Sequence, residues 1–308
     1  MEQQNMLHLS ASPHIHSGKS TAGIMADVLI ALAPAAVAGT VIFGLRSLLV
    51  MLVTVAACVG FEALFNVIVK KDQTVGDLSA CVTGLLLALN LPASIPLWQC
   101  VVGALFAMVV VKGLFGGLGA NPVNPAITAR VFMLVAFGTM AKAAFPVDAV
   151  SSATPLASEE ATSLMDLFLG NHGGAIGETC AAALLLGGIY LIVRRIITWH
   201  IPVAFIGTVF LTSFLMESMD PMAGLAAVLS GGLLIGAIFM ATDYVTSPAT
   251  PWGKIIFGLG AGLITFLIRY FGVYSEGVSF AILFMNIITP YISSWTKRKV
   301  FGVGGKNA

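Results

Sequence analysis

The chain has 308 residues, of which 58% are hydrophobic and 9% are charged, and its formal net charge is +1 at pH 7. Soluble domains carry roughly 25% charged residues, so this composition excludes an ordinary soluble protein and predicts one embedded in a membrane. The small net charge and the lack of long basic runs argue against a nucleic-acid partner.

The first segment, residues 1–22, is polar and has no basic stretch leading directly into a short apolar run. A cleavable secretory signal would show that pattern. We therefore expect the first apolar run to be kept as a membrane span, with residues 1–22 as a cytoplasmic N-terminal segment.

Apolar runs near the roughly 20 residues that a helix needs to cross a bilayer follow along the chain. We predict ten spans, at 23–44, 47–69, 77–91, 95–112, 122–141, 177–197, 201–217, 221–241, 253–273 and 277–293. The predicted fold is an all-α polytopic membrane protein. The third and fourth runs are short and are joined by residues 90–96, which contain two prolines, so this pair either crosses twice or is broken and re-entrant.

Lysine and arginine favour the cytoplasmic side of membrane proteins. With a cytoplasmic N-terminus and ten alternating spans, eleven cations fall inside, three fall outside, and Arg130 lies within a span. The inner ones are Lys19, Lys70, Lys71, Lys112, Arg194, Arg195, Lys254, Lys297, Arg298, Lys299 and Lys306, and the outer ones are Arg46, Lys142 and Arg269. Both termini, including the tail 294–308, are therefore predicted to lie on the cytoplasmic side of the inner membrane.

One carboxylate, Glu62, falls in the middle of the second predicted span. An ionisable group there costs several kcal/mol unless it has a partner or water. Two interpretations are open: Glu62 lines a cation pathway, or it pairs with Arg130 or a backbone group and only stabilises the fold.

The cysteines, by contrast, suggest no special chemistry. Cys58, Cys81, Cys100 and Cys180 lie singly in or beside apolar runs, with no C-x-x-C spacing. Metal centres bound through thiolates need clustered cysteines, so we expect no metal site and no iron–sulfur cluster held by this chain alone.

Two Pro- and Gly-containing signatures, 116–130 and 240–254, each give Asn or Asp, then Val, then Pro-Ala. They occur in the two halves of the chain, 23–141 and 177–293, so we predict an inverted repeat of two five-helix halves with a binding site at interrupted helices. Asn121, Asn124 and Asp243 are the candidate ligand-binding or ion-binding side chains. The alternative is that they only cap two helices.

The longest connection between predicted spans is residues 142–176, which is acidic and rich in Ser, Ala and Thr. The alternating topology places it outside the cytoplasm. Long loops of this kind usually have a function.

A short motif occurs early in this loop. Asp148, Ser151, Ala153 and Thr154 stand at the spacing of D-x-x-[S/T]-G-A-T, which resembles the target that flavin transferases modify by esterifying the threonine with the phosphate of FMN. Ser152 replaces the usual glycine, and since serine is also small we expect the modification to persist. The transferases of this type act outside the cytoplasm, in agreement with the predicted topology of the loop.

Four segments in this order, residues 12–15, 116–126, 151–154 and 241–248, resemble a family of membrane proteins that includes the D component of the Rnf complex and the B component of the Na⁺-pumping NADH:quinone reductase. The resemblance covers nearly the whole chain. The short polar segment before the first span favours the Rnf members, because the quinone-reductase component has a longer N-terminal extension.

This resemblance implies a subunit of a complex that transfers electrons between reduced ferredoxin and NAD while it moves Na⁺ or H⁺ across the membrane. It implies covalent FMN on Thr154 and a second, non-covalent flavin such as riboflavin near Asn121, Asn124 and Asp243. The implied partners are the other subunits of the complex and, for maturation, the flavin transferase. No catalytic side chain is assigned, because the flavins carry the redox chemistry.

Two other functions fit the same sequence features. A secondary transporter or solute channel also builds its site from inverted repeats with broken helices. The quinone-reductase relative differs in its final electron acceptor, which no feature of this chain alone fixes. Covalent flavin on Thr154 would exclude the transporter.

Overall fold

The computed structural model describes residues 20–137, 143–144, 151–152, 163–272 and 277–297. The first half contains α1 (Thr21–Phe43), α2 (Leu45–Val69), the 3₁₀ turn η1 (Val75–Asp77), α3 (Ser79–Leu89), α4 (Leu97–Leu105), the π-helix η2 (Phe106–Gly113) and α5 (Pro125–Ala136). The connection contains two short strands, β1 (Ala143–Ala144) and β2 (Ser151–Ser152), and α6 (Leu164–Leu169). The second half contains α7 (Ala181–Val193), α8 (His200–Met216), α9 (Pro221–Leu229), α10 (Leu233–Ile235), the π-helix η4 (Gly236–Met240), α11 (Pro251–Phe271) and α12 (Val278–Trp295).

Local sequence signals explain where several helices begin. Each of α5, α9 and α11 starts with a proline. A backbone N–H at this position has no partner within the helix, so its absence in proline costs no hydrogen bond, and the fixed φ angle of proline is already helical. The residue before each proline, Asn124, Asp220 or Thr250, caps the helix by accepting a backbone N–H bond on its side chain.

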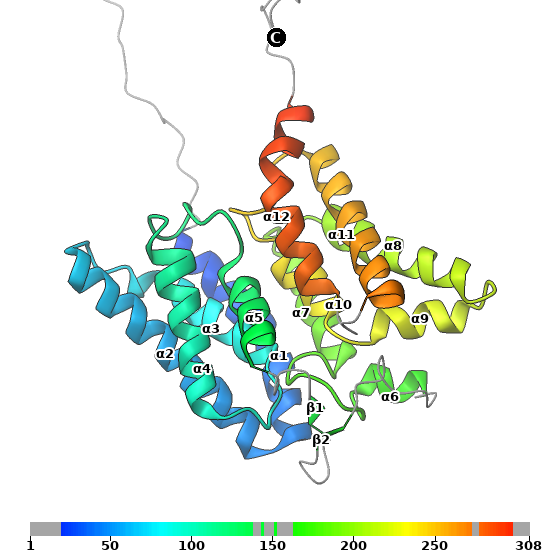
Figure 1. Cartoon of the computed structure of the whole chain (residues 1–308), viewed down its shortest axis with the longest axis horizontal. Helices are drawn as coiled ribbons and strands as arrows, with labels where there is room; N and C mark the ends of the chain where they lie inside the picture. The colour runs from blue at the N-terminus through cyan, green and yellow to red at the C-terminus, as the bar shows by residue number, and fades with distance from the viewer. Residues whose placement is uncertain (1–19, 138–142, 145–150, 153–162, 273–276, 298–308) are drawn as a thin grey trace, which may run out of the picture.

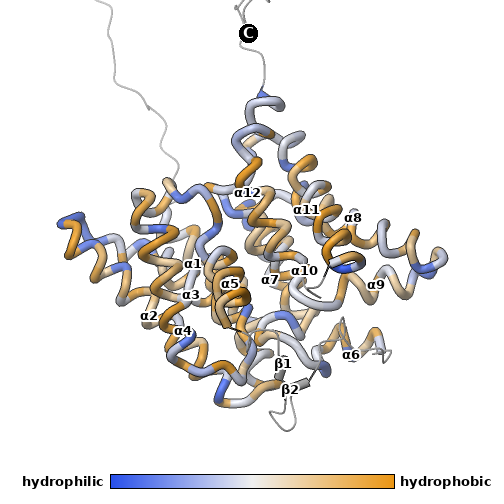
Figure 2. Tube along the Cα trace, viewed as in Figure 1, coloured by the Kyte–Doolittle hydropathy of each residue, from blue (hydrophilic) through white to orange (hydrophobic). Residues whose placement is uncertain are grey.

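Each of the ten predicted spans contains an apolar helix or a bent pair of apolar helices. The helices α1, α2, α11 and α12 are long and apolar enough to cross a membrane, and the bent pair α9–α10/η4, with an angle of 69°, makes a fifth candidate. The other five predicted spans form shorter apolar helices of 10–17 residues. Apolar residues cover most of the helices (Figure 2), and large apolar side chains such as Val41 and Trp295 are exposed on them. The chain is a multi-pass membrane protein with an all-helical body.

Three of these apolar helices are about half the length that a full crossing requires. The 11 residues of α3 extend about 16 Å at 1.5 Å per residue, against roughly 30 Å of hydrocarbon. The helices α5 and α7 have 12 and 13 residues. Hydropathy identified the apolar runs but overestimated the helical part of each, and the number of crossings stays a prediction.

The sixth predicted span, 177–197, is helical only from Ala181. Before it, residues 172–179 form a buried segment without helix. The N–H of Ile176 donates to the carbonyl of Leu91 at 3.0 Å, and the N–H of Gly177 donates to that of Leu89 at 2.7 Å. These bonds satisfy backbone groups that would otherwise be buried without partners, and they fasten the end of the long connection to the end of α3.

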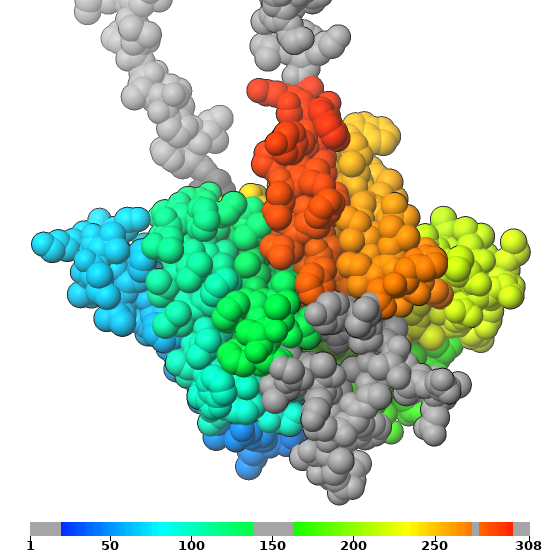
Figure 3. Space-filling model, in the orientation of Figure 1, coloured from blue at the N-terminus to red at the C-terminus, as the bar shows by residue number. Residues whose placement is uncertain are grey.

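The two halves pack against each other along α1 and α7 and between α5 and α12. On the face shown in Figure 3, α5 and α12 lie side by side. The α1–α7 contact needs a glycine, because a Cβ atom at Gly187 would collide with the carbonyl oxygen of Ala31. The start of α1 and the end of α12 lie at one end of the molecule, and the β1–β2 pair lies at the opposite end (Figure 1).

Candidate functional site

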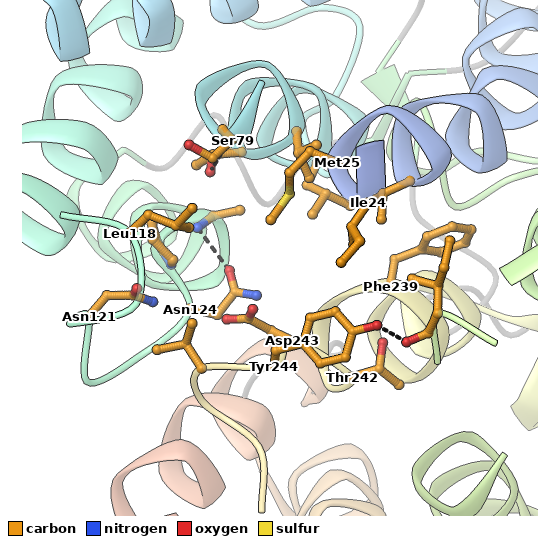
Figure 4. Close-up of a pocket in the computed structure, with 18 of the residues that line it drawn as sticks. Ile24, Met25, Ser79, Leu118, Asn121, Asn124, Phe239, Thr242, Asp243 and Tyr244 are labelled. Atoms are coloured by element: carbon orange, nitrogen blue, oxygen red, sulfur yellow. Dashed lines mark hydrogen bonds between the residues drawn. The ribbon is translucent and has the colours of Figure 1, made fainter. Parts of the chain in front are cut away.

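A cavity lies where the two halves meet, near the start of α1 (Figure 4). It encloses about 790 Å³ of free space, part of it open to the exterior. The residues that line it are Ile24, Met25, Val28, Ser79, Val82, Thr83, Leu86, Lys112, Leu118, Asn121, Asn124, Pro125, Ala126, Leu191, Ile196, Ile197, Phe239, Thr242, Asp243, Tyr244 and Val245. Most of these side chains are apolar, and we call this space the central cavity.

The three candidate residues Asn121, Asn124 and Asp243 all line the central cavity. In Figure 4, Asn124 and Asp243 lie beside each other, and Ile24 and Met25 face them across the space. The two Pro-containing signatures therefore lie at one cavity, and the ligand-binding role of these three residues stays a prediction.

The first signature forms one wall through a loop between η2 and α5. Gly116, Gly117 and Gly119 have φ angles of 122°, 106° and 92°, which other residues rarely adopt. The amide oxygen of Asn124 caps α5 by accepting from the N–H groups of Ala126 and Ile127 at 3.0 and 3.3 Å. The capping alternative is thus correct for this residue, although Asn124 also faces the cavity.

The second signature forms the opposite wall after the π-helix η4. Asp243 does not cap α11, since Thr250 does. Its Oδ2 accepts from the hydroxyl of Thr246 at 3.1 Å. Tyr244 closes this wall by donating its hydroxyl to the carbonyl of Ile196.

Direct contacts connect the two walls. The Nδ2 group of Asn124 donates to the carbonyl of Met240 at 3.2 Å. With its amide oriented so that both groups find partners, Asn286 on α12 donates to the carbonyl of Thr246 and accepts from the N–H of Asn124, both at 3.2 Å. Each signature runs from the end of a π-helix into a helix that starts with proline, so the two segments share a backbone arrangement as well as a sequence pattern.

Glu62 lies outside the central cavity. Its Oε1 accepts from Nζ of Lys112 at 2.6 Å and from the hydroxyl of Thr74 at 2.9 Å. The alternative pairing with Arg130 is therefore wrong. Lys112 also donates to the hydroxyl of Ser79 at 2.6 Å, and both Lys112 and Ser79 line the central cavity.

Sequence reasoning missed the role of Lys112. The charge distribution places it among the cytoplasmic cations at the end of the fourth span, but only 3% of its surface is exposed. Its pairing with Glu62 joins residues 50 positions apart. The only signal in the sequence is a lysine placed directly between an apolar run and a glycine-rich loop.

A second cavity, on the other side of Lys112, has about 570 Å³ of free space and is more polar. It is lined by Glu62, Phe65, Asn66, Lys71, Asp72, Thr74, Met108, Lys112, Gly113, Gly116, Gly117 and Leu118. We call it the Glu62 cavity. Lys112 and Leu118 line both cavities, so the lysine stands in the wall between them.

Arg130 belongs to a different buried network. It donates to Oε1 of Glu178 at 2.6 Å and to the amide oxygen of Asn90. A Cβ atom at Gly232, in the break between α9 and α10, would lie 2.7 Å from Oε1 of Glu178. This ion pair therefore joins α5, the end of α3, the segment before α7 and the bend in the second half.

The flavin-transferase motif is described only in part. Ser151 and Ser152 form β2, which pairs antiparallel with Ala143 and Ala144. Asp148, Ala153 and Thr154 lie outside the described residues. Modification of Thr154 remains a prediction from the sequence.

These features define a class of protein, a multi-pass membrane protein with a mostly apolar cavity between its halves and buried charges beside it. The chain belongs to the NQR2, RnfD, RnfE family, whose model matches residues 8–302. This confirms the family resemblance inferred from the four sequence segments.

Similar proteins cover almost the whole chain. Over 96% of both chains, this one is 46% identical to the D component of the Na⁺-translocating ferredoxin:NAD⁺ oxidoreductase complex of Acetobacterium woodii. Over 97% of both chains, it is 41% identical to the D component of the proton-translocating ferredoxin:NAD⁺ oxidoreductase complex of Clostridium ljungdahlii. It is 33% identical to the D component of the ion-translocating oxidoreductase complex of an Escherichia coli strain, over 96% of this chain and 99% of the relative.

Proposed function

We propose that this chain is a flavin-carrying membrane subunit of an ion-translocating ferredoxin:NAD⁺ oxidoreductase complex, in which it acts with the other subunits. The observation that carries the proposal is the 46% identity over 96% of the chain to a component of a complex of that name. The family match and the two opposed signatures around the central cavity support it.

The central cavity is the proposed site of a non-covalent flavin such as riboflavin. Its lining is mostly apolar with a few polar groups, as in most small-molecule sites. The apolar walls suit a flat aromatic ring system, and Asn121, Asn124 and Asp243 offer donors and acceptors to its polar edge. The flavin would supply one- and two-electron redox chemistry, while these residues bind and orient it.

Thr154 is the proposed attachment site of FMN, with Asp148, Ser151, Ser152 and Ala153 as the segment that the flavin transferase recognises. The motif supports this, as does the position of β1–β2 at the end of the molecule opposite to the start of α1. An extracytoplasmic position is consistent with where such transferases act.

Covalent attachment can be tested directly. The chain is produced together with a competent flavin transferase, denatured and separated on a gel, and flavin fluorescence is recorded. We expect a fluorescent band for the natural sequence, loss of the band in Thr154→Val, and an unchanged band in the control Thr162→Val, which alters a threonine of the same loop. A non-fluorescent natural chain would favour a secondary transporter.

Glu62 and Asp243 are the proposed residues of an ion pathway. Glu62 is buried, and its Oε2 has no hydrogen-bond partner among the described residues. A buried carboxylate oxygen without a donor is a suitable ligand for a cation. Asp243 supplies the second carboxylate, on the wall of the central cavity.

A further inference from the structure

Lys112 is the one charged side chain, among the residues that the structure describes, that lines both cavities. Its Nζ lies 2.6 Å from Oε1 of Glu62 and 2.6 Å from Oγ of Ser79. Only 3% of Lys112 and 6% of Glu62 are exposed. Both charges therefore lie in a low-dielectric environment, in which they respond strongly to any other charge nearby.

The distribution of charge around the central cavity is simple. Among the described residues that line it, Lys112 is the one cation and Asp243 the one anion. On the other side of Lys112, the carboxylate of Glu62 shares its Oε1 between Lys112 and Thr74. Its Oε2 has no hydrogen-bond partner in the part of the chain that the structure describes.

We propose that Lys112 couples the charge of the ligand in the central cavity to the binding of a monovalent cation, Na⁺ or a proton, at Glu62. The inference rests on the proposed flavin site. Negative charge added to a ligand in the central cavity attracts the ammonium group of Lys112 and weakens its hold on Glu62. The carboxylate then needs another cation, which it takes from the Glu62 cavity.

Other polar groups of the Glu62 cavity fit this role. Thr74 donates its hydroxyl to Glu62, and Asn66 donates its Nδ2 group to Thr74 at 3.0 Å, which leaves the amide oxygen of Asn66 as a further oxygen ligand. The charged and titratable groups around Glu62 are Cys58 on the same helix, Asp77, Cys81 and Lys112 from the adjoining elements, and Lys71 and Asp72 in the wall of the cavity.

Coupling of this kind works in both directions, since a linkage between two binding events is reciprocal. A cation bound at Glu62 neutralises the charge of the carboxylate. The positive charge of Lys112 can then stabilise negative charge on a ligand in the central cavity. The midpoint potential of a flavin bound there therefore rises with the concentration of the coupling cation. This is the quantity to measure.

The test uses the full chain purified in nanodiscs, with Thr154→Val as the parent so that no covalent flavin contributes. The parent is loaded with riboflavin and titrated with dithionite in the presence of redox mediators, at several Na⁺ concentrations and several pH values. Free riboflavin is titrated alongside as the reference for the intrinsic pH dependence. Glu62→Gln, the double variant Glu62→Gln/Lys112→Met and Lys112→Arg are compared in the same parent. The double variant removes both charges together and so avoids an unpaired buried carboxylate.

In the parent, the midpoint potential is expected to rise with Na⁺, or to rise with falling pH more steeply than that of free riboflavin. Glu62→Gln frees the charge of Lys112. This substitution is expected to favour binding of reduced over oxidised riboflavin about tenfold, which raises the midpoint potential by about 30 mV for a two-electron couple. It should also abolish the dependence of that potential on Na⁺, or on pH beyond that of free riboflavin. In the double variant the midpoint potential should not show this rise and should not depend on the cation. In Lys112→Arg it should depend on the cation as in the parent.

Two results would overturn the inference: equal potentials for Glu62→Gln and the double variant, or a parent whose potential follows free riboflavin at every Na⁺ concentration and pH. A parent that binds no riboflavin refutes the proposed flavin site itself, and the inference with it. Binding without coupling refutes the inference and leaves the proposed function in place.

Discussion

At the scale of single residues, the described part of the chain buries two ion pairs, Lys112–Glu62 and Arg130–Glu178, at 2.6 Å each. The sequence made Glu62 and Arg130 conspicuous, because both stand inside apolar runs. It could not show their partners, since each pairing joins residues about 50 positions apart and depends on how short helices pack. The convergence of Asn121, Asn124 and Asp243 was predictable, because the two signatures resemble each other locally.

Replacement of Glu62 by Gln separates the two activities of the proposed complex. Glu62→Gln should impair ion transport more than electron transfer, because it removes a cation ligand but no side chain that lines the central cavity. Both rates are measured on the complex in proteoliposomes, the first as ion uptake and the second as ferredoxin-dependent NAD reduction. Equal retention of both rates would remove Glu62 from the pathway, and Glu217→Gln, at the exposed end of α8, serves as the control.

The Arg130–Glu178 pair is expected to matter for stability. Arg130→Met removes the guanidinium that Glu178 contacts, and loss of one partner of a buried pair costs about 3–5 kcal/mol. The melting temperature of the purified chain in detergent should fall clearly. The double variant Arg130→Met/Glu178→Gln should recover much of the loss, because no uncompensated carboxylate remains, and a double variant as unstable as the single one would contradict this account.

At the scale of elements, apolar runs predicted where helices occur but not how long they are. The sixth predicted span begins at residue 177, but residues 177–180 lie outside α7, and the N–H of Gly177 bonds to the carbonyl of Leu89 at the end of α3. The π-helices η2 and η4 also left no recognisable trace in the sequence, since no residue type in them is specific to a π-helix. Proline marks the start of α5, α9 and α11, but of the three corresponding predicted spans only the one at 221–241 begins at its proline.

Close approach of α1 and α7 gives a prediction with a matched control. In Gly187→Ala, the new methyl group meets the carbonyl of Ala31 and lies 2.9 Å from the ring of Phe239, so α1 and α7 must separate. Overpacking of this kind costs about 1–3 kcal/mol, and the melting temperature should fall. Gly207→Ala in α8, where nothing lies within 4 Å of the new atom, should leave it unchanged or raise it slightly through helix propensity. Equal effects of the two substitutions would show that α1 and α7 do not need this contact.

At the scale of the whole molecule, the positive-inside distribution predicts that both termini lie in the cytoplasm and the long connection outside. In a variant without its natural cysteines, Ser163→Cys at the start of α6 and Lys297→Cys after α12 place thiols at exposed positions. A membrane-impermeant maleimide should label the first in intact cells and the second only after lysis. The reverse pattern would invert the proposed topology.

The short helix α3 has a consequence for the molecule as a whole. It begins at Ser79, which holds Lys112, and it ends beside Asn90, which Arg130 contacts. The carbonyls of Leu89 and Leu91 hold the segment that arrives from the long connection. One helix therefore contacts both buried ion pairs and the stretch of chain that follows the long connection, so any displacement of α3 along its axis would alter the contacts of all three.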